Sequence, residues 1–246
     1  NMMSKTILEV RNITAGYVPD LPILRGVSIS IYAGSLTVII GPNGAGKSTL
    51  IKSIAGLVPI SEGMIFLKGE NVSSIRPHQL ANYGISYVPQ SNNIFRTLTV
   101  KQNLSLALRN VGKNATDRLT DLLHQFPNLS VKLNEKAGAL SGGQRQFLAV
   151  AMALATSPQI ILLDEPSAGL SPKASQEVLE MLNEMTSRGV TIILVEQNVN
   201  QALSLANHCY ILAEGVNQVD GKASELLGNS IVSEIYLGGK RLRVQK

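Results

Sequence analysis

A glycine-rich segment in the first quarter of the chain has the residue types and spacing that bind phosphate. Its residues are Gly41, Pro42, Asn43, Gly44, Ala45, Gly46, Lys47, Ser48 and Thr49. They match the pattern G-x-x-x-x-G-K-[ST], in which glycines let successive backbone N–H groups point inward around an anion. Lys47 brings a positive charge suited to the β- and γ-phosphates of a nucleotide, and the Ser48 hydroxyl suits Mg²⁺. The segment predicts a nucleoside triphosphate site.

The residues on either side of this loop supply the strand–loop–helix context that the pattern needs. Residues 36–40 are a short, branched apolar run typical of a buried parallel strand. Residues 48–57 contain no proline and have apolar side chains at helical spacing, which predicts an amphipathic helix. A turn that only links a strand to a helix is the alternative, and the complete pattern in this context disfavours it.

A pair of carboxylates follows another apolar run. Residues 160–163 read Ile-Ile-Leu-Leu, and Asp164 and Glu165 come directly after them. Ligands of open α/β sheets bind outside the carboxyl ends of the strands, where the phosphate loop must also lie. We therefore expect Asp164 to hold Mg²⁺ through a water and Glu165 to orient or deprotonate the attacking water. Two solvated acids at a strand end are the alternative.

A third segment, residues 141–144, begins a predicted helix. Ser141 and Gln144 form the S-x-x-Q pattern of a capping box, with the serine as N-cap. Gly142 and Gly143 occupy the first helical turn, where each costs about 1 kcal/mol relative to alanine. A capping box needs neither glycine, so we expect a group such as a γ-phosphate to approach this backbone closely. One nucleotide per chain does not explain two phosphate-binding segments.

Short apolar runs alternate with helical patterns along most of the chain. Strands are predicted at residues 6–10, 27–31, 36–40, 64–67, 85–88, 160–163 and 191–195, and helices at 48–57, 99–126, 145–156, 172–188 and from 198 to 206. This alternation indicates an α/β fold with a parallel sheet. The helical stretch after residue 99 interrupts the strands, so we predict one domain with a helical lobe.

Composition excludes several classes of protein. The 246 residues are 44% hydrophobic and 16% charged, which is typical of a folded chain and not of a disordered one. No apolar run approaches the ~18 residues of a membrane span, and no secretory signal is expected. The single cysteine, Cys209, lies in an apolar run and is expected to be a buried, inert thiol, which fits a cytosolic chain.

The net charge of +5 does not indicate a nucleic-acid partner. Residues 240–246 carry four basic residues and no acidic one, which leaves 18 basic against 17 acidic residues in the remainder. A basic tail can contact anionic lipid or another subunit, but a solvated chain end is the simpler interpretation. We expect no nucleic acid to bind.

The order and spacing of these segments resemble the nucleotide-binding subunits of ABC transporters. The resemblance is carried by the phosphate loop at 41–48, Gln90, the Leu-Ser-Gly-Gly-Gln segment at 140–144 and the Leu-Asp-Glu segment at 163–165. It implies the P-loop ABC ATPase fold, a RecA-like parallel-sheet core with an N-terminal antiparallel β subdomain and a helical subdomain inserted at about 91–150. The domain would cover residues 1–239 and leave 240–246 as a basic tail.

The same resemblance implies roles for residues that local patterns leave open. ATP and Mg²⁺ would bind between two such domains arranged head to tail, with residues 141–144 closing on the nucleotide of the partner. Gln90 would contact Mg²⁺ and the attacking water. Tyr17, which follows Gly16 in a turn-rich connection, would stack on adenine. From the residues alone, an ordinary half-buried tyrosine is equally compatible with this position.

More narrowly, the chain resembles the smaller ATPase subunit of branched-chain amino acid importers. The segments Val195-Glu196-Gln197-Asn198 and Ile235-Tyr236-Leu237-Gly238-Gly239 carry this likeness. It implies a second ATPase subunit, identical or paralogous, two membrane permeases that meet the helical lobe, and a solute-binding protein. The location would be cytoplasmic, peripheral on the inner face of the membrane. Importers of urea or amides are an alternative.

The chain departs from the broad family pattern at two positions. Gln197 stands where most members have a switch histidine, and Ser171 stands where an aspartate is usual. A neutral amide can hydrogen-bond a γ-phosphate but cannot carry the charge of an imidazolium. We therefore expect Gln197 to act in catalysis beside Lys47, Gln90 and Glu165, in a dimer with a paralogue that keeps the histidine.

Two rival classes are disfavoured. A soluble ABC-type ATPase acting on DNA or ribosomes would need a long coiled coil or a second cassette, yet only 92 residues lie between Ser48 and Ser141. A nucleotide-binding regulator without turnover would not need the carboxylate of Glu165. An ATPase that drives transport is the main prediction.

Overall fold

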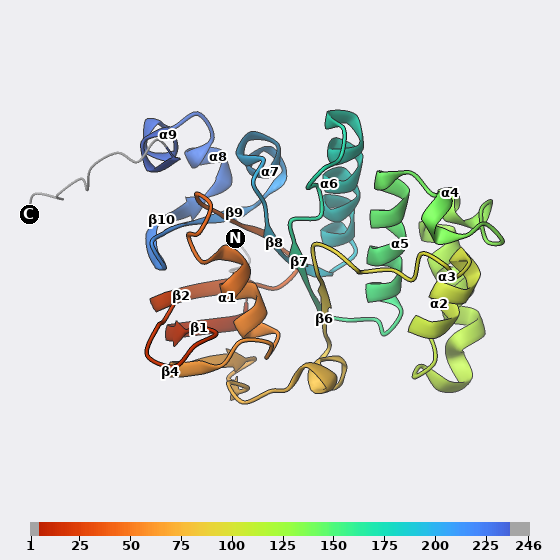
Figure 1. Cartoon of the computed structure of the whole chain (residues 1–246), viewed down its shortest axis with the longest axis horizontal. Helices are drawn as coiled ribbons and strands as arrows, with labels where there is room; N and C mark the ends of the chain where they lie inside the picture. Colours follow the sequence, from red (N-terminus) through yellow and green to blue (C-terminus); the bar gives the residue numbers. More distant parts are fainter. Residues whose placement is uncertain (1–4, 237–246) are drawn as a thin grey trace, which may run out of the picture.

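The centre of the fold is a sheet of six strands in the described part of the chain, residues 5–236 of a computed structural model (Figure 1). The strand order is β10-β9-β3-β8-β7-β6, and all neighbours are parallel except β10 and β9. The strands are β3 (Leu36–Ile40), β6 (Ile85–Val88), β7 (Ile160–Asp164), β8 (Thr191–Val195), β9 (His208–Ala213) and β10 (Val216–Lys222). The predicted α/β fold with a parallel sheet is confirmed.

The central strands are buried on both faces, because successive side chains point into two different cores. In β8, Ile192 and Leu194 pack into one core, whereas Ile193 and Val195 pack into the other. All five residues of this strand are buried. Burial on both sides explains why the parallel strands read as continuous apolar runs in the sequence.

Helices cover one face of the sheet and extend beyond β6 as a lobe (Figure 1). They are α2 (Val100–Ala107), α3 (Ala115–Gln125), α4 (Pro127–Ser130), α5 (Gly142–Leu154), α6 (Pro172–Ser187), α7 (Val199–Leu205), α8 (Ala223–Leu226) and α9 (Ser230–Tyr236). The lobe consists of α2 to α5, and it lies where the insertion at about 91–150 is predicted. The domain limits themselves stay a prediction.

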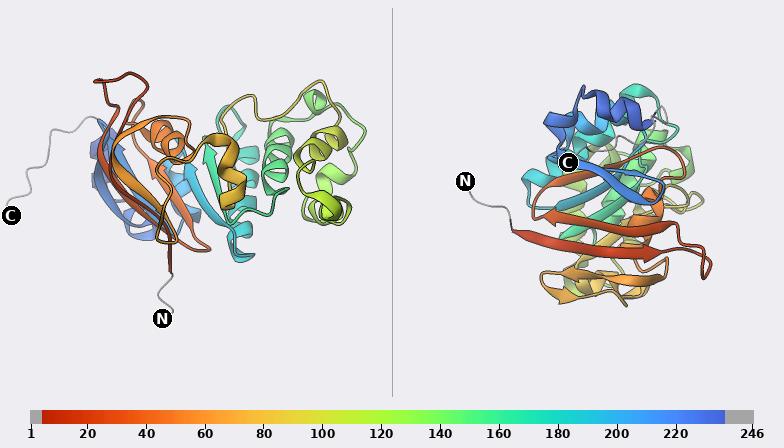
Figure 2. Two further views of the ribbon diagram at one scale, coloured as in Figure 1. Left: turned by 90° about the horizontal axis from the view of Figure 1, so that it is seen from below. Right: turned by 90° about the vertical axis from the view of Figure 1, so that its left-hand side faces the viewer.

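The opposite face of the sheet packs on α1 (Lys47–Ile54) and on a second, antiparallel sheet (Figure 2). This sheet has the order β2-β1-β4-β5 and comprises β1 (Thr6–Ala15), β2 (Leu24–Tyr32), β4 (Ile60–Leu67) and β5 (Glu70–Asn71). Helix α1 contributes Leu50, Ile51 and Ile54 to the core between the two sheets. The phosphate loop therefore leads into a helix that is held by both sheets.

The prediction of one helical stretch over residues 99–126 is wrong in detail. Helix α2 ends at Ala107, and a single 3₁₀ turn at Gly112–Asn114 separates it from α3. Gly112 has φ 75°, a left-handed value that favours glycine and cannot continue an α-helix. The sequence reads as one helical pattern because α2 and α3 both bury apolar side chains in the same core.

The β9–β10 hairpin was not predicted, although the sequence contains a signal for it. Glu214 and Gly215 both have positive φ, 53° and 77°, as a two-residue hairpin turn requires. The apolar run before them forms β9 and includes Cys209, which is fully buried as expected. Burial raises the pKa of the Cys209 thiol to about 12, as is typical of a structural cysteine.

Among residues 5–236, no helix combines the length and the apolar character needed to cross a bilayer. The predicted basic tail at 240–246, most of the segment at 235–239 and the first four residues lie outside the described part of the chain.

Candidate functional site

The phosphate loop connects β3 to α1 at the carboxyl end of the parallel sheet. Two of its glycines are required by contacts of the loop with the rest of the fold. A Cβ at Gly41 would lie 2.1 Å from the Leu212 carbonyl oxygen, and one at Gly46 would lie 2.7 Å from the Leu24 side chain. Gly46 also has φ 98° as the residue before α1. The loop is thus fitted against both sheets.

Lys47, at the start of α1, is buried and folds back over the loop that precedes it. Its Nζ donates to the Gly41 carbonyl at 2.8 Å and to the Pro42 carbonyl at 3.2 Å. Burial lowers the pKa of the Lys47 amine, while the nearby carboxylates of Glu165 and Asp164 act in the opposite direction. The amine is therefore placed between the loop and the two acids predicted to act with it.

Ser48 and Asp164 meet across the first turn of α1 and the end of β7. The Ser48 hydroxyl donates to Asp164 Oδ1 at 2.7 Å, although 116 positions separate the two residues. Asp164 is buried, with 3% of its surface exposed. The pair presents a hydroxyl and a carboxylate, which are hard oxygen ligands of the kind that Mg²⁺ prefers. The donor set fits the predicted metal.

Glu165 is held by two amide side chains that come from different segments. Gln90 Nε2 donates to its Oε2 at 3.0 Å, and Gln197 Nε2 donates to the same oxygen at 2.9 Å. Glu165 also lines the cavity at the phosphate loop. The structure therefore brings together four residues predicted to act in catalysis, Lys47, Gln90, Glu165 and Gln197. Within this group, the Gln197 side chain is hydrogen-bonded to the carboxylate of Glu165.

The backbone of Glu165 adopts a left-handed conformation with φ 49°, which is unfavourable for a residue with a side chain. Its N–H donates to the Val195 carbonyl at 2.9 Å, and its carbonyl accepts from the Ala168 N–H at 3.1 Å. Strained residues held in this way cluster at functional sites. The conformation turns the chain sharply at the end of β7 and aims the carboxylate at the loop.

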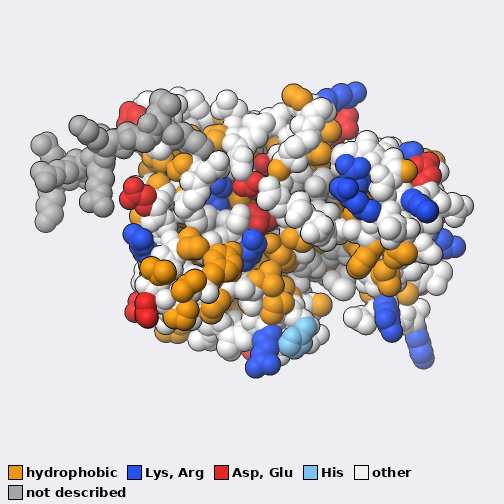
Figure 3. All heavy atoms as spheres, viewed as in Figure 1, with side chains coloured by type: hydrophobic (Ala, Val, Ile, Leu, Met, Phe, Trp, Pro, Cys, Tyr) orange, Lys and Arg blue, Asp and Glu red, His pale blue; other side chains and the backbone are white. Residues whose placement is uncertain are grey.

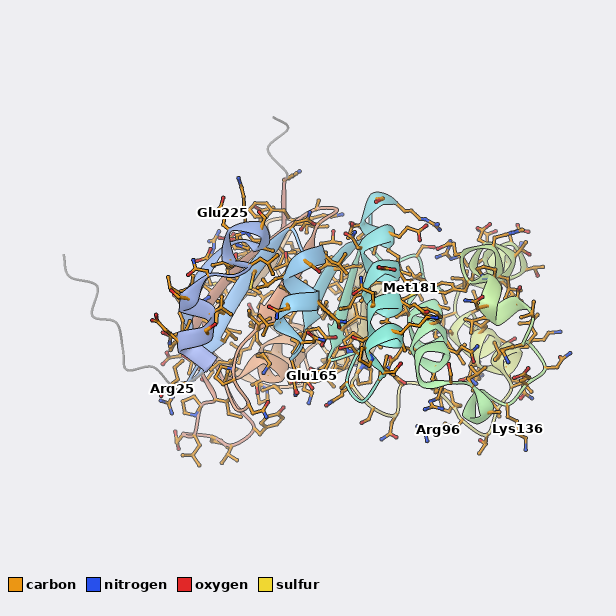
Figure 4. The ribbon with its side chains drawn as sticks, turned by 90° about the horizontal axis from the view of Figure 1, so that it is seen from above. Arg25, Arg96, Lys136, Glu165, Met181 and Glu225 are labelled. Carbon is orange, nitrogen blue, oxygen red and sulfur yellow. The ribbon has the colours of Figure 1, made fainter. Side chains whose placement is uncertain are left out.

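The segment at 141–144 is not part of the cavity around the phosphate loop. Within the described chain that cavity is lined by Ile23, residues 43–49 and Glu165. Tyr17 is not among them either, and its side chain is 54% exposed in the connection between β1 and β2. Figure 4 shows Glu165 on the same side of the molecule as Arg96, which precedes the lobe, and Lys136, which lies between α4 and α5.

The capping box at the start of α5 is present as predicted. Gln144 N–H donates to the Ser141 hydroxyl at 3.2 Å, and Ser141 N–H donates to the Gln144 side chain at 3.0 Å. One of the two glycines, Gly142, has a close neighbour that the sequence did not reveal. A Cβ at Gly142 would lie 2.7 Å from the Leu170 side chain, so Leu170 approaches this backbone closely within the chain itself.

Glu196 and Ser167 form a pair beside these residues that the sequence patterns did not predict. Both are buried, and the Ser167 hydroxyl donates to Glu196 Oε2 at 2.7 Å. A signal was available, because Glu196 directly follows the apolar strand β8, as Asp164 and Glu165 follow the apolar run of β7. A carboxylate at that place lies at the same edge of the sheet.

Comparison with known proteins identifies the family. The family model described as ABC transporter matches residues 24–168, which is more than half of the chain. The chain belongs to the ABC transporter family. It is an ATPase of that family, and the predicted P-loop ABC ATPase fold is confirmed.

Curated relatives match almost the full length of this ABC ATPase. The probable branched-chain amino acid transport ATP-binding protein LivF of Archaeoglobus fulgidus is 41% identical over 234 residues, which cover 94% of the chain and 99% of that protein. The high-affinity branched-chain amino acid transport ATP-binding protein BraG of Pseudomonas aeruginosa is 36% identical and covers 91% of the chain and 96% of that protein. The lipopolysaccharide export protein LptB of Haemophilus influenzae is 32% identical, with 95% and 98% covered.

Solved structures agree with this assignment. The ADP conformation of an ATP-binding cassette of an ABC transporter has a TM-score of 0.86 at 30% identity and covers 96% of this chain and all of that one. A dimeric post-hydrolysis state of another cassette, bound to ADP and Pi, has a TM-score of 0.76 at 26% identity and covers 88% and 99%.

Proposed function

We propose that this ABC ATPase drives the uptake of branched-chain amino acids through membrane permeases. The observation that supports this best is the 41% identity to LivF across nearly the whole of both chains. The Val195-Glu196-Gln197-Asn198 segment, which carried the narrower resemblance, lies at the site itself. The ATPase would act on the inner face of the cell membrane together with a solute-binding protein.

The phosphate loop binds the nucleotide in this proposal. The backbone N–H groups of residues 43–49 and the amine of Lys47 hold the β- and γ-phosphates. Ser48, Asp164 and Gln90 would hold Mg²⁺, which would neutralise charge that develops on the phosphates. Tyr17, in its exposed connection, would stack on the adenine once the nucleotide is bound.

Hydrolysis is assigned to Glu165 and the two amides that hold it. Gln90 and Gln197 occupy Oε2 of this carboxylate, which leaves Oε1 to accept a hydrogen bond from the attacking water. The amides thus fix the orientation of Glu165 and add no charge. Phosphoryl transfer needs little covalent chemistry, so positioning of the water accounts for most of what these residues contribute.

The second half of the site comes from a partner ATPase subunit. Residues 141–144 begin α5 in the lobe and line no part of the chain's own phosphate-loop cavity. In a head-to-tail dimer, their backbone would close on the γ-phosphate bound by the partner. The dimeric post-hydrolysis state of a related cassette supports this arrangement.

A groove between the core and the lobe is the docking surface that we assign to a permease. Its volume is about 410 Å³, and its apolar lining comes from both sides, from Leu57, Leu80, Ala107, Ala149 and Met152. Figure 3 shows an indentation of the surface between these two parts of the molecule. Leu57 is 46% exposed at the rim, where a buried partner segment would cover it.

Replacing Leu57 by Asp is expected to release the ATPase from membranes and to abolish leucine uptake, because a charge would replace an apolar contact at the groove. Co-purification of tagged protein with its permeases and uptake of labelled leucine, with urea as the competing solute, are the measurements. Leu227→Asp is the matched control, since Leu227 is 45% exposed outside the groove. Retention of permeases and uptake by Leu57→Asp would refute the assignment of this surface.

The working dimer in this proposal pairs the chain with a paralogue. Gln197 is neutral and is engaged with Glu165, so this site lacks the charge that an imidazolium would bring to the γ-phosphate. Ser171 serves as the N-cap of α6, accepting from the Ala174 N–H at 3.3 Å. We expect unequal hydrolysis at the two sites.

Mixing the chain with a histidine-bearing paralogue is expected to raise ATP hydrolysis per subunit well above the sum of the separate rates, because each subunit completes the other's site. Phosphate release measured at fixed total protein and varied ratio should peak at one to one. A homodimer of this chain that turns over at the full transport-coupled rate would contradict the pairing.

A second candidate rests on LptB, whose printed function is lipopolysaccharide export. The lower identity of 32% and the Val195–Asn198 segment favour the amino acid importer. The uptake assay above also separates the two functions.

A further inference from the structure

The carboxylate of Glu196 hydrogen-bonds two neighbouring parts of the site, the segment at Ser167 and the backbone of Gln197. Its Oε1 accepts from the Ser167 N–H at 3.1 Å, and its Oε2 accepts from the Ser167 hydroxyl at 2.7 Å. The Gln197 N–H also donates to Oε2, at 3.2 Å. One side chain therefore binds the segment that follows Glu165 and the residue that holds Glu165.

This carboxylate is buried, and its neighbours satisfy it without a cation. Only 1% of the Glu196 surface is exposed, and no lysine, arginine or histidine in the described chain pairs with it. Burial raises the pKa of Glu196, and the charge of Glu165 acts in the same direction, while the bonds from Ser167 and Gln197 lower it. Burying an acid costs free energy, and here the three hydrogen bonds from Ser167 and Gln197 offset that cost.

The backbone places Glu196 where it can act on the site. Its N–H donates to the Ile39 carbonyl at 3.3 Å, in the strand that leads into the phosphate loop. The preceding residue, Val195, accepts the Glu165 N–H at 2.9 Å. The Glu196 backbone is thus anchored to β3, and its carboxylate binds Ser167, two residues after Glu165.

A second set of contacts joins the same two segments farther from the loop. Gln201 Oε1 accepts from the Ser175 hydroxyl at 2.8 Å and from the Asn198 side chain at 2.6 Å. The Gln201 amide donates to the Pro172 carbonyl at 3.5 Å. The start of α6 and the start of α7 are therefore joined as one unit, with Glu196 at the end nearest to the site.

We propose that Glu196 is a positioning residue for hydrolysis. Its bonds to Ser167 and to the Gln197 backbone fix the orientation of the Glu165 carboxylate and of the Gln197 amide that binds it. It touches neither the phosphate loop nor the predicted metal ligands, so it acts on turnover and leaves ATP binding unchanged. This inference rests on the role of Glu165 proposed above. Through the Glu196 carboxylate, the segment at Ser167, which precedes α6, is also connected by hydrogen bonds to Gln197.

The test compares Ser167→Thr with Ser167→Val, which have the same shape and differ in the hydroxyl. The full chain is assayed for kcat and for the KM of ATP, in the dimeric assembly that gives the highest turnover. We expect Ser167→Thr to keep kcat close to that of the unchanged protein and Ser167→Val to lower kcat by about 10- to 100-fold with KM unaltered. Equal kcat values for the two variants, or a loss in KM alone, would overturn the proposal.

Two further variants complete the design. Ser167→Ala adds no volume and is expected to show the same loss as Ser167→Val, so a wild-type rate for Ser167→Ala would also refute the link. Glu196→Gln keeps the size of the side chain but offers one acceptor oxygen where the carboxylate uses two. We expect it to lower kcat with ATP binding retained. Glu165→Gln distinguishes a failure of the proposed function from a failure of this inference. If this variant hydrolyses ATP normally, the role assigned to Glu165 is wrong. If it is inactive while Ser167→Thr and Ser167→Val have equal kcat values, only the positioning role of Glu196 is rejected.

Discussion

Replacing Glu165 by Gln is expected to stop steady-state ATP hydrolysis while leaving ATP binding intact. The amide has the same size, and its oxygen can still accept hydrogen bonds from Gln90 and Gln197, so the local arrangement is kept. The variant cannot take a proton from the attacking water. Loss of a general base lowers turnover by about 100- to 10,000-fold.

The second consequence of Glu165→Gln is an ATP-bound dimer that persists. Because hydrolysis would reopen the dimer, its loss should trap the closed state, which light scattering can detect as a doubled mass in the presence of ATP. Glu225→Gln is the control, since Figure 4 shows Glu225 on the side of the molecule opposite to Glu165. Undiminished phosphate release by Glu165→Gln would remove Glu165 from its assigned role.

Replacing Lys47 by Ala is expected to weaken ATP binding itself. The change removes the positive charge next to the phosphates and the two bonds from Nζ to the loop carbonyls of Gly41 and Pro42. One charged hydrogen bond from this amine to a phosphate would contribute about 1.5–3 kcal/mol, so its loss corresponds to a decrease in affinity of about 10- to 100-fold. Titration with a fluorescent ATP analogue measures this change.

A matched control for Lys47→Ala lies in the same helix. Lys52 is in the last turn of α1 and lines no part of the phosphate-loop cavity, so Lys52→Ala should bind ATP normally. Thermal unfolding of both variants reports whether the helix is intact. Unchanged affinity in folded Lys47→Ala would exclude this amine as the main phosphate partner.

The two variants are expected to fail at different steps, because the residues belong to different parts of the site. In the proposed mechanism, Lys47, at the start of α1, binds the nucleotide before any dimer forms. Glu165 follows the end of β7 and would act on water once the phosphates are in place. Both residues line one cavity, yet we expect the Glu165 variant to bind ATP without turnover and the Lys47 variant to bind ATP weakly.

Features that depend on neighbouring residues were predictable from the sequence alone. The strand–loop–helix at the phosphate loop, the capping box of Ser141 and Gln144, and the helix predicted from residue 172 all formed as expected. Each is stabilised by hydrogen bonds within a few residues, so its pattern can be read locally. The α/β class followed from the alternation of such elements.

Only the tertiary structure decided which distant residues meet. Gln90, Glu165 and Gln197 come together because the sheet order puts β7 between β6 and β8, and strand order is set by long-range packing. The close approach of Leu170 to Gly142, and the bonds from Ser167 to Glu196, arise in the same way. Sequence therefore determined the phosphate loop and the class of fold, whereas packing across the sheet decided how the Glu165 carboxylate is held.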